Sequence, residues 1–97
     1  MLSSKQRGYL SQLASKMDPV LMIGKEGLSE GVEQAFLKQL NNRELIKVRF
    51  VASKDERFDA ASVLAEKAGA ELVRVIGNVA IFYRKSEDPE KRNIVLP

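Results

Sequence analysis

Apolar and polar side chains alternate along this chain with two periods, and the change of period marks the predicted elements. Residues 3–17 carry apolar side chains at helical spacing, which predicts an amphipathic helix. Ser3 and Gln6 have the capping-box spacing at its start, and Asp18-Pro19 ends it because the residue before proline disfavours the helical conformation. The apolar stripe consists of Tyr9, Leu10, Leu13, Ala14 and Met17.

The middle of the chain alternates between strands and helices. Residues 20–23 are uniformly apolar, which is typical of a central strand, and residues 45–51 alternate with a period of two. That alternation places Ile46, Val48 and Phe50 on a core face and Lys47 and Arg49 on a solvent face. Helical spacing returns in residues 30–41 and 58–68, with Phe58 assigned to the inner side of the second of these helices.

Two final strands, residues 72–76 and 79–84, are joined by Gly77-Asn78. This dipeptide predicts a type II′ hairpin with Ile76 opposite Val79 and Arg74 opposite Ile81. Both sides of the hairpin are apolar, so the pattern leaves open which side meets the helices.

The order α-β-α-β-α-β-β predicts a two-layer α/β fold, in which a four-stranded mixed sheet packs with three helices. At 97 residues the chain is expected to form one domain, residues 1–97. Residues 85–97 are mostly polar and are expected to form a mobile tail, which residues 94–96 could tack down.

Composition narrows the class of function. The chain has no cysteine and no histidine, which removes the commonest nucleophile–base pairs and metal ligands. We therefore expect a non-enzymatic binding protein without a metal or other cofactor. No apolar run approaches membrane-spanning length and the N-terminus lacks a signal-peptide core, so we expect a cytoplasmic protein that does not engage membranes.

Positive charge is unevenly distributed. The formal net charge is +3, and Lys and Arg outnumber Asp and Glu by two in each of residues 1–27, 46–58 and 72–97. The segments between them have an acidic excess. This asymmetry favours a polyanion-binding face opposite a neutral back, although ordinary solvated charge also explains it.

The segment Gly24-Lys25-Glu26-Gly27 lies between the first strand and Ser29, where the second helix is expected to begin. A glycine loop that leads into a helix N-terminus presents backbone N–H groups and the positive end of a dipole, which suits a phosphate. Glu26 weakens that potential. A tight turn that requires positive φ explains the same residues, so both interpretations stay open at this point.

Several blocks of the sequence together resemble the YhbY family, also called the CRM domain. The resemblance covers nearly the whole chain in order, although Ser15 and Arg43 stand where many members carry histidine. The matching blocks are Leu2-Ser3-Ser4-Lys5-Gln6-Arg7, Leu13-Ala14, Asp18-Pro19-Val20, Ile23-Gly24-Lys25-Glu26-Gly27-Leu28-Ser29, Arg43-Glu44-Leu45-Ile46-Lys47-Val48 and Val75-Ile76-Gly77-Asn78-Val79-Ala80-Ile81-Phe82-Tyr83-Arg84.

The resemblance implies an RNA-binding domain similar in fold to the C-terminal domain of the third bacterial initiation factor. It implies association with precursors of the large ribosomal subunit and its rRNA, and a phosphate-contacting role for the glycine loop. We expect a monomer whose candidate RNA-binding residues are Lys5, Arg7, Gly24, Lys25, Glu26, Gly27, Lys47, Arg49, Arg84 and Lys85.

Two other classes of function remain as alternatives. The first is an adaptor that docks on ribosomal proteins without touching RNA. The second is an enzyme that uses the glycine loop on a small phosphate compound, but the chain lacks the Lys-Ser/Thr ending of a P-loop and any evident base.

Overall fold

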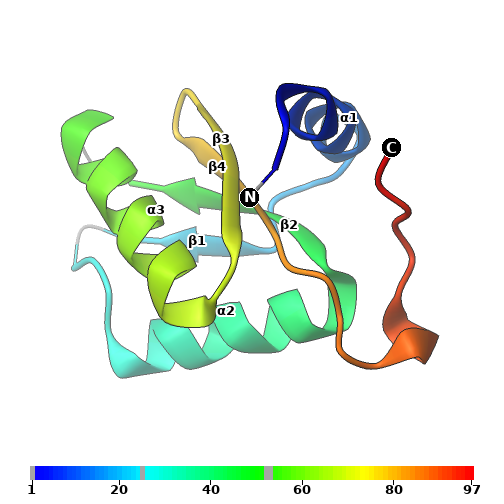
Figure 1. Cartoon of the computed structure of the whole chain (residues 1–97). Helices are drawn as coiled ribbons and strands as arrows, with labels where there is room; N and C mark the ends of the chain where they lie inside the picture. The colour runs from blue at the N-terminus through cyan, green and yellow to red at the C-terminus, as the bar shows by residue number, and fades with distance from the viewer. Residues whose placement is uncertain (1, 25, 52–53) are drawn as a thin grey trace.

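The predicted order of helices and strands is confirmed in a computed structural model that describes residues 2–24, 26–51 and 54–97 (Figure 1). One short 3₁₀ helix follows the last strand. The elements are α1 (Ser4–Ala14), β1 (Leu21–Ile23), α2 (Glu30–Arg43), β2 (Leu45–Phe50), α3 (Lys54–Ala68), β3 (Glu71–Ile76), β4 (Val79–Tyr83) and η1 (Pro89–Lys91).

The four strands form one mixed sheet in the order β1-β2-β4-β3. β1 is parallel to β2, whereas β4 is antiparallel to both of its neighbours. β1 and β3 are therefore the edge strands, and the central pair β2–β4 is hydrogen-bonded on both sides. This confirms the predicted α/β class and the four-stranded mixed sheet.

The layering differs from the two-layer arrangement expected from the sequence, because helices cover both faces of the sheet. α2 and α3 pack on one face, and α1 packs on the other (Figure 1). On the α2–α3 face, the rings of Phe36 and Phe82 meet edge to face with their centroids 4.8 Å apart. On the α1 face, Leu10 and Ala14 cover Leu45, Ile81 and Tyr83. β2 and β4 bury side chains at both odd and even positions, so each face of the sheet carries a core. The sequence pattern assigns the face that bears Lys47 and Arg49 to solvent.

Local signals explain where the helices begin and end. The predicted capping box is present, since the N–H of Gln6 donates to Ser3 Oγ at 3.1 Å and the N–H of Ser3 donates to Gln6 Oε1 at 3.0 Å. α3 begins at Lys54, one turn earlier than predicted. That extra turn is polar and contains Asp55 and Glu56, which favour a helix N-terminus, but it gives no apolar periodicity. The inner position predicted for Phe58 is wrong, because its side chain is 56% exposed.

The hairpin between β3 and β4 has the predicted turn and pairing. Gly77 has φ of 59°, and Ile76 pairs with Val79 and Arg74 with Ile81. The register shifts between Leu72 and Arg74, so Val73 is an extra residue of a β-bulge. Val73 therefore packs on the α1 face, while Leu72 packs on the α2–α3 face. The two apolar sides of the hairpin are explained, because each side meets a helical layer.

The segment after β4 returns to the α1 face, where Ile94 and Leu96 pack on the core. Glu44, at the end of α2, holds this segment. Its side chain is fully buried and its φ is +62°. Its two carboxylate oxygens accept the backbone N–H groups of Ser86 and Asn93, each at 2.7 Å. One buried carboxylate thus joins the end of α2 to both ends of the loop that contains η1.

Replacement of this carboxylate is expected to destabilise the protein. Glu44→Ala leaves the N–H groups of Ser86 and Asn93 without their acceptors and empties a fully buried position, which costs about 2–4 kcal/mol of unfolding free energy. Chemical denaturation measures this loss, and hydrogen exchange at Ser86 and Asn93 should accelerate. The exposed Glu66→Ala is the matched control. Equal stability of the two variants would contradict the role of Glu44.

Tyr83 gives the stability a dependence on alkaline pH. Burial, and then the negative charge of Glu44, raise the pKa of Tyr83 above its ordinary value of 10.0, and Arg92 opposes the shift. Because the folded state disfavours the phenolate, this contribution is complete below the unfolded pKa and is lost as pH rises through the folded pKa. Tyr83→Phe should therefore flatten the alkaline fall in melting temperature relative to the parent protein. Parallel profiles above pH 10.0 would contradict this.

Candidate nucleic-acid interface

The glycine loop follows β1 directly and forms a turn closed by a backbone hydrogen bond. The N–H of Gly27 donates to the carbonyl of Gly24 at 3.0 Å, and Gly27 has φ of +77°. An added Cβ at either glycine would meet no atom within 4 Å. Gly27 is thus required by its backbone conformation, whereas Gly24 leaves open space at the surface. Lys25, a predicted contact, lies outside the described residues.

The mouth of α2 is partly capped by its own residues. Ser29 Oγ accepts the N–H of Val32 at 3.2 Å, and Ser29 O accepts the N–H of Glu33 at 2.9 Å. Within the described residues, the N–H groups of Glu30 and Gly31 have no protein acceptor. The structure therefore leaves fewer first-turn donors for an anion than the sequence suggested.

Acidic side chains also reduce the positive potential of this mouth. Glu30 and Glu33 lie in the first turn of α2, and Glu26 is exposed in the loop. Lys67 of α3 offsets one of them, because its Nζ lies 2.7 Å from Glu33 Oε1. A phosphate at this site would therefore need additional cations from neighbouring elements.

Three of the predicted cations bind backbone carbonyls of the protein itself. Arg7 Nη1 donates to Leu72 O at 2.7 Å and to Val73 O at 2.8 Å, at the bulge of the edge strand β3. Lys47 Nζ donates to the carbonyl of Met17 at 3.1 Å, which joins the chain just after α1 to β2.

Arg84 is the third, and its Nη1 donates to the carbonyl of Ala68 at 2.8 Å. It thereby supplies a donor at the C-terminal end of α3, where cations are stabilising. Arg7, Lys47 and Arg84 all hold the fold together, which their sequence positions did not indicate. The remaining described cations of the predicted set, Lys5, Arg49 and Lys85, are exposed.

The structure separates the predicted set into different regions. Arg49 lies at the same end of the sheet as the glycine loop, since the next residue, Phe50, pairs with Ile23 and donates its N–H to Asn78 O at 2.7 Å. Arg84 and Lys85 follow Tyr83, which pairs with Leu45 at the opposite end of the sheet. In Figure 1 the loop after β1 is at the left and the chain after β4 runs to the right.

The first helix is likewise distant from the loop. Arg7 is bound at β3, whereas the loop extends from β1, the other edge strand. Lys5 and Arg7 therefore do not join the glycine loop in one local cluster. Of the described cations in the predicted set, Arg49 is the one that the sheet register brings to the loop end.

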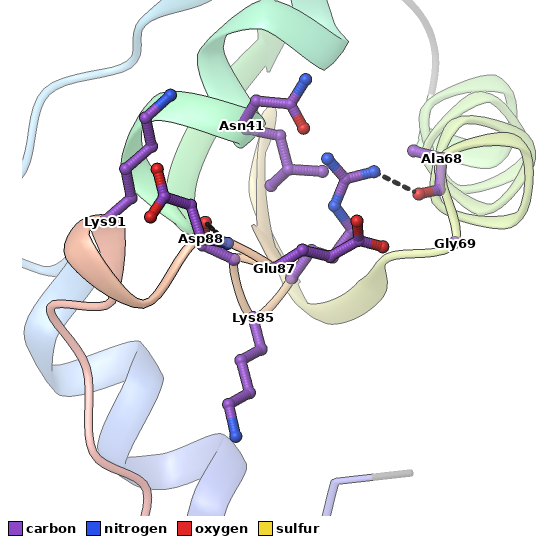
Figure 2. Close-up of a pocket in the computed structure, with 10 residues that line it drawn as sticks. Asn41, Ala68, Gly69, Lys85, Glu87, Asp88 and Lys91 are labelled. Carbon is purple, nitrogen blue, oxygen red and sulfur yellow. Dashed lines mark hydrogen bonds between the residues drawn. The ribbon is translucent and has the colours of Figure 1, made fainter.

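A hollow of about 720 Å³ lies at the other end of the molecule (Figure 2). The C-terminal ends of α2 and α3 line it together with the segment after β4. Its cations Arg84, Lys85 and Lys91 are mixed with Glu87 and Asp88, and Figure 2 shows Lys85 extending away from Asn41 and Ala68. The sequence did not predict this hollow, because three segments far apart in the chain form it.

The described part of the chain has neither a metal-binding cluster nor a membrane-spanning helix. No cluster of three or more His, Cys, Asp or Glu side chains there could hold a metal ion. No helix there has the length and apolar character needed to cross a bilayer.

The sequence matches the model of the CRS1 / YhbY (CRM) domain over residues 2–84. An "RNA-binding protein" of Haemophilus influenzae is 36% identical over 88 residues, covering 90% of this chain and 89% of the relative. "Probable RNA-binding protein YqeI" of Bacillus subtilis is 32% identical over 98 residues, covering 100% of both chains.

A solved structure agrees with this assignment. The solution structure of a hypothetical protein from Staphylococcus aureus superposes with a TM-score of 0.87 at 40% identity, covering 100% of both chains. The chain therefore belongs to the CRS1/YhbY (CRM) domain family, as the sequence resemblance predicted.

The structural assignment of Arg7 is testable against its neighbour Lys5. Arg7→Gln removes charged donors from two carbonyls at the β3 bulge and should lower the unfolding free energy by about 1–3 kcal/mol. Lys5→Gln, one half-turn away and exposed, should change it by less than about 0.5 kcal/mol. Urea denaturation of both variants measures the difference. Similar values for both would show that Arg7 does not brace the sheet edge.

Proposed function

We propose that this protein is a non-enzymatic, monomeric RNA-binding protein of the cytoplasm that associates with precursor large ribosomal subunits and their rRNA during assembly. The names of its full-length relatives support the RNA-binding part of the proposal. The ribosomal part rests on the family resemblance in the sequence. The structural observation that carries the proposal is the glycine loop, which has open space beside both glycines. It leads into the N-terminus of α2, where the N–H groups of Glu30 and Gly31 are available.

The proposed mechanism is recognition of the RNA backbone. A phosphate would accept the N–H groups of Glu30 and Gly31, next to Gly24 and Gly27, with Lys25 supplying positive charge. Arg49 would contact the RNA from the other face of the sheet, at the same end. Lys5 and Lys85 would contact more distant phosphates, while Arg7, Lys47 and Arg84 would act through the fold and contribute to the general field. Phosphate contacts of this kind fix position and carry little sequence information, so RNA shape would determine specificity.

An adaptor that docks on ribosomal proteins is the second candidate. Phe58 and Val63, exposed by 56% and 41% on α3, favour it, because exposed apolar side chains often mark protein contacts. Charge reversal at Lys5 and Lys25 distinguishes the two candidates. An adaptor would keep its association with ribosomal particles, whereas the proposed RNA-binding protein would lose it.

Gly24 allows a direct test of the loop. Gly24→Asp fits sterically and places a carboxylate where the phosphate is proposed to sit. Two like charges about 4 Å apart cost about 1 kcal/mol even at the dielectric constant of water, so RNA affinity should fall at least about fivefold. Fluorescence anisotropy with labelled rRNA fragments measures this.

Two variants control for other effects of that substitution. Gly24→Ser is uncharged and should bind nearly as well as the parent protein, and Gln34→Glu adds the same charge at an exposed position of α2. Equal affinity of Gly24→Asp and Gly24→Ser would contradict phosphate binding at the loop.

The ribosomal part needs an experiment in cells. Crosslinking of the protein to RNA, followed by sequencing of the attached RNA, should recover precursors of large-subunit rRNA. Recovery of messenger or transfer RNA alone would contradict the ribosomal role and would leave RNA binding intact.

A further inference from the structure

One row of side chains crosses the α1 face of the sheet without a helix above it. Met22 pairs with Arg49, Arg49 with Val79, and Val79 with Ile76, so the row runs across all four strands. Their chain neighbours Ile23, Val48, Ala80 and Val75 pack on the α2–α3 side, which places the row on the opposite face. We call Met22, Arg49, Val79 and Ile76, together with Arg74, the open strip.

The helix α1 does not extend over this end of the sheet. Leu10 and Ala14 pack on Leu45, Tyr83 and Ile81, which belong to the other two rows of the same face. The Met22 and Ile76 side chains are consequently 64% and 56% exposed. Ile76 adjoins the partly exposed Val79 in this row, and contiguous apolar side chains left in water are a feature of surfaces that bind another molecule.

The charge of the open strip favours a polyanion as its occupant. Arg49 and Arg74 are both exposed, and the strip and its neighbours Lys47 and Ile81 in the adjacent row include no acidic residue. A shallow hollow of about 330 Å³ lies beside Arg49, along residues 19–22. Apolar side chains between guanidinium groups suit nucleobases, which stack on arginine planes and pack against aliphatic groups.

The strip and the glycine loop lie at the same end of the sheet, and the loop leads from that end to α2 on the opposite face. Met22 lies two residues before Gly24, and Phe50 joins the hairpin turn to the end of β2 through the hydrogen bond to Asn78. At the spacing of neighbouring strands, the four-strand row spans about 14 Å. Other four-stranded RNA-binding sheets accommodate two or three bases across their strands, which is the same scale.

We propose that the open strip binds the unpaired bases of a single-stranded RNA segment whose backbone is held at the glycine loop. This inference rests on the proposed RNA binding and adds to it the kind of RNA that the site accepts. A duplex would still bind through its phosphates, but its stacked bases could not reach the strip.

Uncharged substitutions test the strip separately from its charge. Met22→Ser with Ile76→Ser removes two exposed apolar side chains that bases would bury, and should weaken binding of a single-stranded oligouridine of about ten nucleotides by about tenfold. Binding of a blunt-ended RNA duplex of about 16 base pairs should stay within about twofold. The dependence of affinity on salt should not change, because no charge is altered.

Matched variants and a second pair complete the experiment. Val63→Ser with Val95→Ser removes two exposed apolar side chains elsewhere and should bind both RNAs like the parent protein. Arg49→Gln with Arg74→Gln should weaken single-strand binding more than Lys38→Gln with Lys91→Gln, which removes the same two charges at exposed positions elsewhere. Thermal melting of every variant confirms that each is folded.

The outcomes separate this inference from the proposed function. If the parent protein binds RNA and Met22→Ser with Ile76→Ser binds the single strand equally well, the strip does not contact bases. The same conclusion holds if the affinities for the single strand and the duplex fall together. It also holds if those substitutions abolish association with ribosomal particles while RNA affinity is unchanged, because the strip is then a protein-docking surface. If the parent protein binds neither RNA, the proposed function itself is wrong.

Discussion

The central strand pair β2–β4 is the constraint on which the rest of the structure depends. Both strands bury side chains on both faces, with Ile46, Phe82 and their neighbours under α2 and α3 and with Leu45 and Ile81 under α1. Apolar burial of about 25 cal/mol per Å² makes these two clusters the main source of stability. Because both faces are used, the sheet has a helical layer on each side.

This constraint determines what the charged residues can do. Because α1 lies over one end of the sheet, Arg7 reaches the carbonyls at the bulge of β3. Lys47 donates to a carbonyl of the chain just after α1. Arg84 does the same for α3. Arg7, Lys47 and Arg84, which the sequence offers as nucleic-acid contacts, therefore stabilise the fold. The opposite end of the sheet, which α1 does not cover, keeps the glycine loop and Arg49 accessible.

The sequence predicted the elements well because their signals are local. The capping box of Ser3 and Gln6, the Gly77-Asn78 turn and the alternation of β2 each depend on a few neighbouring residues. The bulge at Val73 and the face covered by α1 depend on contacts between distant segments, so no local pattern contained them. The site was harder for the same reason. The sequence offers Arg7 and Arg49 equally as cations, and only the tertiary contacts show that Arg7 binds carbonyls of β3 while Arg49 is exposed.

RNA is proposed to bind at the end of the sheet that bears the glycine loop, and an NMR titration with unlabelled single-stranded RNA tests this most directly. The largest backbone amide shifts should fall on Gly24, Gly27, Glu30 and Gly31, with further changes along Met22 and Ile76. Little change is expected around the hollow formed by residues 84–91. Shifts confined to that hollow, with the glycine loop unaffected, would contradict the account.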